Sequence, residues 1–120
     1  MILLDTHIFI FALADKLRNN EEQHLRTDAW SISAISLWEI AKLVQIGRLQ
    51  LSLASPHYQD ALSQIHIWPL SAEIAERSTM LDFGGDPADE IIAATSIVQA
   101  IPLVTRDAEI RGSKLVTFLN

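Results

Sequence analysis

The chain has 120 residues, of which 49% are hydrophobic, and it carries 15 Asp and Glu against 9 Lys and Arg, for a net charge of −6. This length predicts one globular domain over residues 1–120, and the apolar content excludes a disordered protein. The absence of cysteine excludes disulfides, thiol catalysis and thiolate zinc sites. The negative net charge argues against a protein that binds nucleic acid through an overall positive charge.

The first residues, MILLDTHIFIFALADKLRNN, contain an apolar stretch without a preceding basic segment or a small-residue cleavage site. They therefore do not have the pattern of a secretory signal, and we expect a mature, cytoplasmic protein. No apolar run approaches the roughly 18 residues that a membrane-spanning helix needs. We expect no membrane association.

Short apolar runs alternate with longer helix-period stretches, which is the pattern of β-α units and a parallel sheet. MILL predicts a first strand, followed by a helix through about Leu17. The polar segment RNNEEQHLRTD is interpreted as a loop or a marginal helix. WSIS predicts a second strand, and AISLWEIAKLVQIGRL predicts a strong helix that Gly47 ends.

The second half of the chain continues this alternation. SPHYQDALSQI predicts a helix capped by Ser55, HIWPL a third strand, and SAEIAERSTMLDF a helix capped by Ser71. After Gly84 and Gly85, residues 87–99 predict an almost wholly apolar, buried helix, followed by a fourth strand, IPLVT, and a short fifth, KLVTF. Because crossovers between parallel strands are right-handed, we expect a three-layer α/β/α sandwich with a central parallel sheet of four to five strands.

Acidic residues stand at several predicted starts of helices. They are Asp5 after MILL, Glu39 in the predicted first turn after WSIS, Asp86 and Asp89 before the apolar helix, and Asp107 after IPLVT. Taken singly, capping explains them: Ser36 and Glu39 fit an S-x-x-E capping box, and Asp86 with Pro87 makes a similar cap. However, Ser71 caps its helix without an acid at the box position, so capping does not require a carboxylate at every junction.

The strand exits of a parallel sheet share one edge, so these acids are predicted to converge there. Converging carboxylates repel one another, and divalent cations offset that repulsion. The chain has no cysteine, and its four histidines show no HxxxH or HxH spacing. Carboxylate ligands therefore favour Mg²⁺ or Mn²⁺ over zinc.

Three segments, taken together, resemble PIN-domain ribonucleases, and in particular the VapC-type toxins of bacterial toxin–antitoxin pairs. They are LLDTHIFIFAL, SAISLWEIAKLVQIGRLQL and DPADEIIAATSIVQAIPLVTRDAEI, and they span nearly the whole chain in the family's order and spacing. The resemblance implies a single PIN domain and a Mg²⁺- or Mn²⁺-dependent endoribonuclease that hydrolyses transfer or ribosomal RNA to arrest growth. It also implies a VapB-type antitoxin as partner and a homodimer.

The resemblance also implies roles for individual residues. The catalytic and metal-binding quartet is Asp5, Glu39, Asp89 and Asp107, supported by the hydroxyls of Thr6, Ser36 and Thr105. Asp86 either binds a metal-bound water or only caps its helix. Arg106 either contacts an RNA phosphate or is an exposed arginine at a strand end. Two departures concern substrate contacts. Ala88 and Glu90 stand where the family often has an aromatic residue and then Arg, and Gly84 and Gly85 occupy a stretch where it often has His.

Other functions fit the sequence less well. A catalytically weak PIN domain that binds RNA or a partner is the alternative, and the intact quartet favours the nuclease. A receiver domain needs Asp at the end of the third strand, where this chain has WPLS. An aspartate-nucleophile phosphatase needs a second Asp at position 7, which is His7 and is interpreted as a helix-start residue. Both fit poorly.

Overall fold

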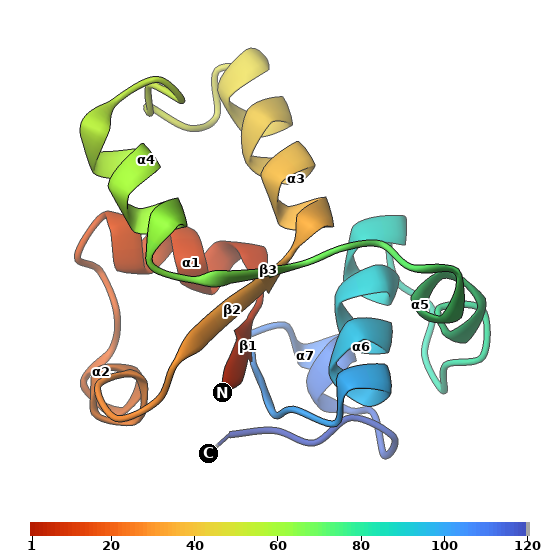
Figure 1. The fold of residues 1–120 in the computed structure, drawn as a ribbon. Helices are drawn as coiled ribbons and strands as arrows, with labels where there is room; N and C mark the ends of the chain where they lie inside the picture. Colours follow the sequence, from red (N-terminus) through yellow and green to blue (C-terminus); the bar gives the residue numbers. More distant parts are fainter. Residues whose placement is uncertain (120) are drawn as a thin grey trace.

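Helices and strands alternate along the chain, as the sequence pattern predicts. The structure is a computed structural model that describes residues 1–119 (Figure 1). In chain order its elements are β1 (Ile2–Leu4), α1 (Thr6–Leu13), α2 (Asn19–Leu25), β2 (Trp30–Ser33), α3 (Ala34–Gln45), α4 (Pro56–Ser63), β3 (His66–Trp68), α5 (Ala72–Arg77), α6 (Pro87–Gln99), β4 (Leu103–Val104) and α7 (Ala108–Arg111).

The strands form one parallel, four-stranded sheet in the order β3-β2-β1-β4. Its register places Leu3 opposite Ser31 on one side and opposite Leu103 on the other. The chain thus builds outward from β1 to β2 and β3, and then returns to add β4 on the free side of β1. The junction of β1 and β4 is the topological switch point, where the carboxyl ends of the strands open a crevice for ligands.

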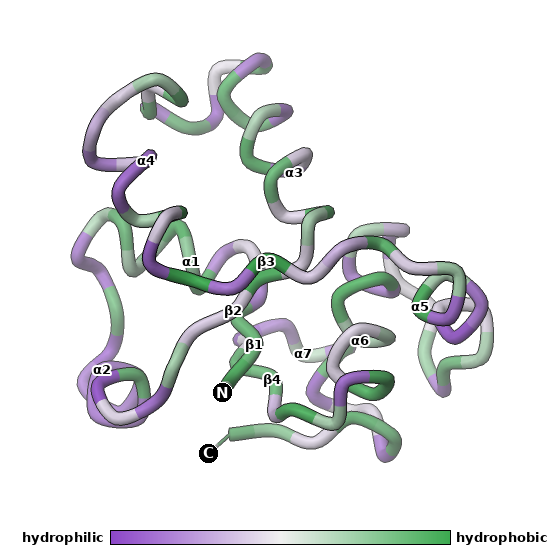
Figure 2. Tube along the Cα trace, viewed as in Figure 1, coloured by the Kyte–Doolittle hydropathy of each residue, from purple (hydrophilic) through white to green (hydrophobic). Residues whose placement is uncertain are grey.

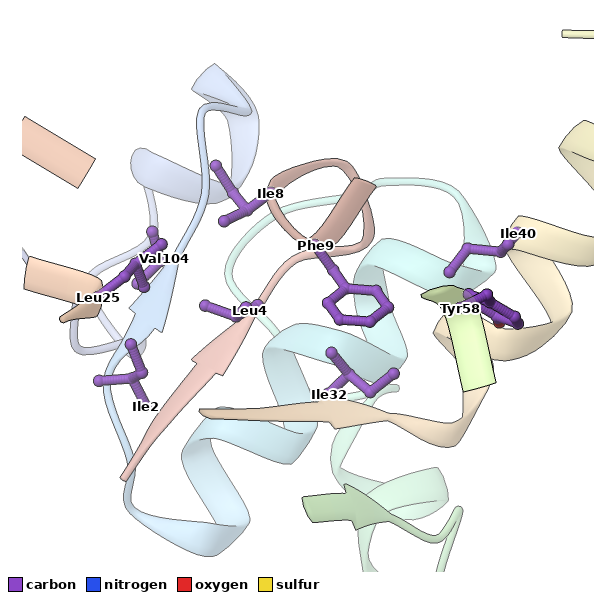
Figure 3. Close-up of a cluster of buried hydrophobic side chains, with 9 residues drawn as sticks. All are labelled: Ile2, Leu4, Ile8, Phe9, Leu25, Ile32, Ile40, Tyr58 and Val104. Atoms are coloured by element: carbon purple, nitrogen blue, oxygen red, sulfur yellow. The ribbon is translucent and has the colours of Figure 1, made fainter. Parts of the chain in front are cut away.

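Both faces of the sheet are buried, because alternate residues of β1 point to opposite sides. Ile2 and Leu4 belong to a cluster with side chains from α1 to α4, among them Phe9 (Figure 3). Leu3 packs on the other side with α6 and α7, where it meets Ile92. Figure 2 shows β1 and β4 as hydrophobic and α2 as largely hydrophilic. The predicted three-layer α/β/α fold is confirmed.

The connection between β1 and β2 holds two helices. α1 ends at Leu13 instead of reaching Leu17, so the predicted end was wrong: Asp15 adopts a left-handed φ of 56°, which Asp tolerates and which stops a helix. α2 forms from the segment that the sequence left open between loop and helix. Its first turn is fixed by the backbone N–H of Arg18, which donates to Glu21 Oε1 at 2.7 Å.

Two later predictions differ from the structure, one in the length of a helix and the other in the presence of a strand. α5 ends at Arg77, because the hydroxyls of Ser78 and Thr79 donate to carbonyls of the last turn and compete with further helix. The fifth strand, KLVTF, was wrong: in residues 1–119 it makes a single parallel bridge, between Leu103 and Phe118. β4 is only two residues long and offers a further strand little backbone to pair with.

α6 has 13 residues and lies against the sheet, with buried alanines that allow a close approach. It begins and ends where the sequence predicts. Its C-terminus is unusual, because Ala100 adopts the left-handed conformation, with φ 54° and ψ 45°. No helix in the described residues is both long and apolar enough to span a membrane.

We expect Ala100→Gly to raise the free energy of unfolding by about 0.5–1 kcal/mol, because glycine adopts a left-handed cap without the steric cost of a Cβ. Ala75→Gly, at an exposed position inside α5, is the matched control and should lower it by about 1 kcal/mol. Urea unfolding measures both. Equal destabilisation by the two substitutions would show that Ala100 is not strained.

Candidate active site

Five acidic side chains gather at the switch point of the sheet, in one pocket. This pocket has a volume of about 370 Å³ and is lined by Asp5, His7, Phe11, Glu39, Asp86, Asp89, Arg106 and Asp107. The structure therefore brings the predicted quartet together from segments far apart in sequence. The sequence reasoning missed His7 and Phe11 as lining residues. Their i, i+4 spacing, two residues after Asp5, places both on one face of α1 and was an available signal.

Asp5 lies directly after β1 and caps α1. Its carboxylate accepts a hydrogen bond from the backbone N–H of Thr6 at 2.8 Å and one from the hydroxyl of Thr105 at 2.7 Å. The side chain is nearly inaccessible, with the residue 4% exposed. Burial raises the pKa of Asp5, while the hydrogen bond from Thr105 opposes that rise. Asp5 is thus held in one orientation at the floor of the pocket.

Thr105 links Asp5 to Asp107. Its hydroxyl donates to Asp5 and accepts from the backbone N–H of Asp107 at 3.0 Å. Asp107 in turn caps α7, where its Oδ1 accepts from the N–H groups of Glu109 and Ile110 at 2.9 and 3.1 Å. The sequence analysis missed α7, although an Asp followed by a short segment and Gly is a recognisable signature of a short helix.

Glu39 is held by two buried hydroxyls. The Thr6 hydroxyl donates to Glu39 Oε1, and the Ser36 hydroxyl lies 2.7 Å from that of Thr6. Because Thr6 has one hydroxyl proton and gives it to Glu39, Ser36 is the donor in the second bond. Burial raises the pKa of Glu39, and after the opposing hydrogen bond from Thr6 the charges of Asp5 and Asp86 raise it further.

The structure rules out the capping box that was the alternative explanation for Ser36 and Glu39. The N-cap of α3 is Ser33, whose hydroxyl accepts from the N–H of Ile35 at 3.2 Å. Ser36 and Glu39 therefore lie inside the helix, and Glu39 stands in its second turn rather than its first. Helix capping does not explain this glutamate, whose carboxylate faces other acids in the pocket.

The two acids that open α6 have separate tasks. Asp86 is the N-cap, and its Oδ1 accepts from the N–H of Asp89 at 2.8 Å. Asp89 contributes only its backbone to this cap, so its carboxylate lies in the pocket. Burial raises its pKa to about 7, and the charges of the other four acids add to the effect, that of Asp86 most.

The departures from the family pattern lie beside the pocket, not in it. Ala88 is buried and Glu90 is half-buried, and neither lines the pocket. The chain at Gly85 passes close to Asp89: a Cβ built on this glycine would lie 3.4 Å from the Asp89 Cβ. At this distance a Cβ would be in ordinary van der Waals contact, so the loop before α6 lies against the acid without requiring glycine at this position.

Arg106 is engaged in an ion pair at the rim of the pocket. Its Nε and one terminal nitrogen donate to the two carboxylate oxygens of Glu21 at 2.8 and 2.6 Å, and its guanidinium carbon lies 4.1 Å from the centre of the Phe11 ring. The hydrogen bond from Arg106 lowers the pKa of Glu21. The sequence reasoning did not identify Glu21, because a partner 85 residues away leaves no local signal.

The acids surround an open pocket rather than a closed cage. No three His, Asp or Glu side chains of residues 1–119 are arranged as a ready-made metal site. Mg²⁺ rarely needs such a cage, because it keeps several waters and binds one or two carboxylates together with substrate phosphates. The carboxylate donors, and the mutual repulsion that contributes to the raised pKa of Asp89, fit a hard divalent cation.

Comparison with known proteins assigns the chain to a family. Residues 2–113 match the PIN domain. This chain belongs to the PIN domain family. Ribonuclease VapC22 of Mycobacterium tuberculosis is 29% identical over 119 residues, which cover 94% of this chain and 92% of the relative. The resemblance inferred from the sequence is confirmed.

Solved structures of toxin–antitoxin complexes contain chains with the same fold. A chain of a toxin–antitoxin complex from Klebsiella pneumoniae superposes with a TM-score of 0.72 and 27% identity, covering 93% of this chain and 92% of its own. A chain of VapBC2 from Rickettsia felis, solved with a DNA fragment of the promoter, gives a TM-score of 0.74 and 23% identity, covering 100% and 98%.

We expect Asp89→Asn to stabilise the protein in the presence of a chelator at pH values above the Asp89 pKa of about 7. A carboxyl group with a raised pKa in the folded state binds its proton more tightly there than in the unfolded chain. The contribution of Asp89 to the parent's free energy of unfolding is therefore highest below the ordinary Asp pKa of 3.8. It falls as the pH rises from 3.8 through the folded-state pKa of about 7. Allowing for solvent screening, the variant should exceed the parent by about 1–2 kcal/mol above that pH.

Thermal unfolding across this pH window measures the effect. Asp60→Asn, at an exposed position of α4 outside the pocket, removes the same charge and should show no comparable dependence on pH. A constant difference between Asp89→Asn and the parent at all pH values would contradict the assignment of repulsion and burial to Asp89.

Proposed function

We propose that the protein is a Mg²⁺- or Mn²⁺-dependent endoribonuclease that hydrolyses phosphodiester bonds of transfer or ribosomal RNA, and that it acts in the cytoplasm as the toxin of a toxin–antitoxin pair. The observation that carries this proposal is the meeting of Asp5, Glu39, Asp89 and Asp107 in one pocket at the sheet's switch point. The similarity to ribonuclease VapC22 and to a chain of the Klebsiella toxin–antitoxin complex supports it.

The carboxylates have distinct parts in this proposal. Asp5, Asp89 and Asp107 hold the divalent cation, directly or through water. When bound, such an ion supplies an activated water and neutralises charge on the phosphate. Glu39 orients water or accepts its proton, since a raised pKa brings a carboxylate nearer to the range in which a general base works.

The hydroxyl residues act by positioning. Thr6 fixes Glu39 and is itself fixed by Ser36, and Thr105 holds Asp5 and the chain before Asp107. Asp86 fixes the first turn of α6 and adds negative charge near Asp89. None of these four needs to touch the substrate to affect cleavage.

We expect the purified protein to cut transfer or ribosomal RNA in Mg²⁺ or Mn²⁺ and not in EDTA. Asp5→Asn and Asp89→Asn should each lower the rate by two or more orders of magnitude, because a positioned ligand or proton-transfer group is lost. Asp60→Asn should cut like the parent. Cleavage that persists in EDTA would exclude the metal-dependent reaction, and a folded parent that binds RNA without cutting it would favour the catalytically weak alternative.

We also expect a homodimer and an antitoxin that covers the pocket. Trp38 in α3 and Ile46 at its C-cap are 55% and 59% exposed, and a dimer interface over them would remove this apolar surface from water. Light scattering should give twice the 13.4 kDa mass of the chain. A monomer at micromolar concentration would contradict the dimer.

The antitoxin is expected to be the product of a neighbouring gene. Co-expression of the two proteins should relieve growth arrest, because a basic side chain of the antitoxin pairs with the acids of the pocket.

A further inference from the structure

A second pocket lies beside the acidic one and has the opposite character. It has a volume of about 190 Å³ and is lined by Arg18, Asn20, Glu21, His24, Val104, Thr105, Arg106, Arg111 and Leu119. Three of the chain's nine Lys and Arg residues are among them, against one acid. Arg106 lines both pockets, so the two are neighbours. We call the second one the arginine pocket.

The single acid of the arginine pocket is already engaged. Both carboxylate oxygens of Glu21 accept hydrogen bonds from Arg106, at 2.8 and 2.6 Å, which balances one positive charge. Arg111 donates to the Thr105 carbonyl at 3.2 Å, and its guanidinium carbon lies 5.3 Å from the centre of the Phe118 ring. A neutral carbonyl does not compensate the charge of Arg111, and within residues 1–119 neither Arg111 nor Arg18 forms an ion pair. Among the described residues, the two arginines therefore give this pocket an excess of positive charge.

We propose that the arginine pocket binds a backbone phosphate of the RNA, next to the phosphate that is cleaved in the acidic pocket. This inference rests on the proposed ribonuclease function. The guanidinium groups of Arg18 and Arg111 bind the phosphate oxygens, for which their planar fork of N–H donors is suited. Arg106 is held between Glu21 and the Phe11 ring and lines both pockets. Its side chain therefore separates the arginine pocket from the acidic pocket.

The charge of the molecule favours such a site. A polyanion that approaches a chain of net charge −6, at a pocket lined by five acids, is repelled until cations beside that pocket hold it. An acidic peptide segment would satisfy the arginines equally well, but it would not need them to border the acids. RNA does, because one strand carries phosphates into both pockets.

The test measures RNA binding apart from cleavage. In an Asp89→Asn background, Arg18→Gln and Arg111→Gln are compared by fluorescence anisotropy with a short, labelled single-stranded RNA of mixed sequence. Each substitution should weaken binding roughly three- to tenfold. Each should also reduce the slope of log affinity against log salt by about 0.7, the value for one phosphate contact on a single strand.

Arg26→Gln is the matched control. Arg26 directly follows α2, is exposed, and lies 3.9 Å from Glu22, outside the arginine pocket. This substitution removes the same charge and should leave the affinity and the salt slope near those of the background protein. Circular dichroism of all three variants checks that the exposed arginines are not needed for folding.

The outcomes separate this inference from the proposed function. If the parent cuts RNA but Arg18→Gln and Arg111→Gln bind it like Arg26→Gln, the arginine pocket is not a phosphate site and the ribonuclease stands. If the arginine variants lose RNA binding while the parent never cuts, the site stands and the proposed function fails. Binding of a poly-glutamate peptide at these arginines, without an effect on RNA, would overturn the inference in favour of an acidic protein partner.

Discussion

Five carboxylates lie in one pocket at the edge of the sheet, where their negative charges repel one another. Four of them accept hydrogen bonds: Asp5 from Thr6 and Thr105, Glu39 from Thr6, Asp86 from Asp89, and Asp107 from the first turn of α7. Among the bonds of residues 1–119, none goes to the carboxylate of Asp89, and its pKa is the one raised to about 7. Of the five acids, Asp89 is thus the one whose negative charge is least stabilised by the protein. A bound cation would stabilise the ionised form of this carboxylate more than that of the other four.

Helix capping and site building are the same interactions in this protein. Asp5, Asp86 and Asp107 are the N-caps of α1, α6 and α7, and all three line the acidic pocket. Each cap draws a helix start to the pocket, and the positive end of a helix dipole offsets part of the repulsion between acids. The sequence posed capping and ligand binding as alternatives, but a carboxylate has two oxygens and can serve both. For the carboxylates of Glu39 and Asp89, the structure excludes capping.

The four strands of the sheet, α6 and the convergence of the acids could be predicted because each depends on short segments and on one topological rule. The N-cap of α3 could not, since Ser33 and Ser36 are both plausible caps and only the packing of Ser36 against Thr6 decides between them. The end of α1 depends on a single left-handed residue, Asp15. The pair of Glu21 and Arg106 joins α2 to the exit of β4, and no periodicity in either segment indicates the other.

In the proposed function, the charge of RNA connects the two pockets. The first turn of α6 has Glu90 at a position where the family resemblance implies an arginine, and Glu90 is half-buried and outside the pocket. The start of α6 thus adds negative charge beside the acidic pocket. In the further proposal, the positive charge comes instead from Arg18 and Arg111, in the arginine pocket that shares Arg106 with the acidic pocket. RNA binding, so proposed, depends on α2 and α7 rather than on α6.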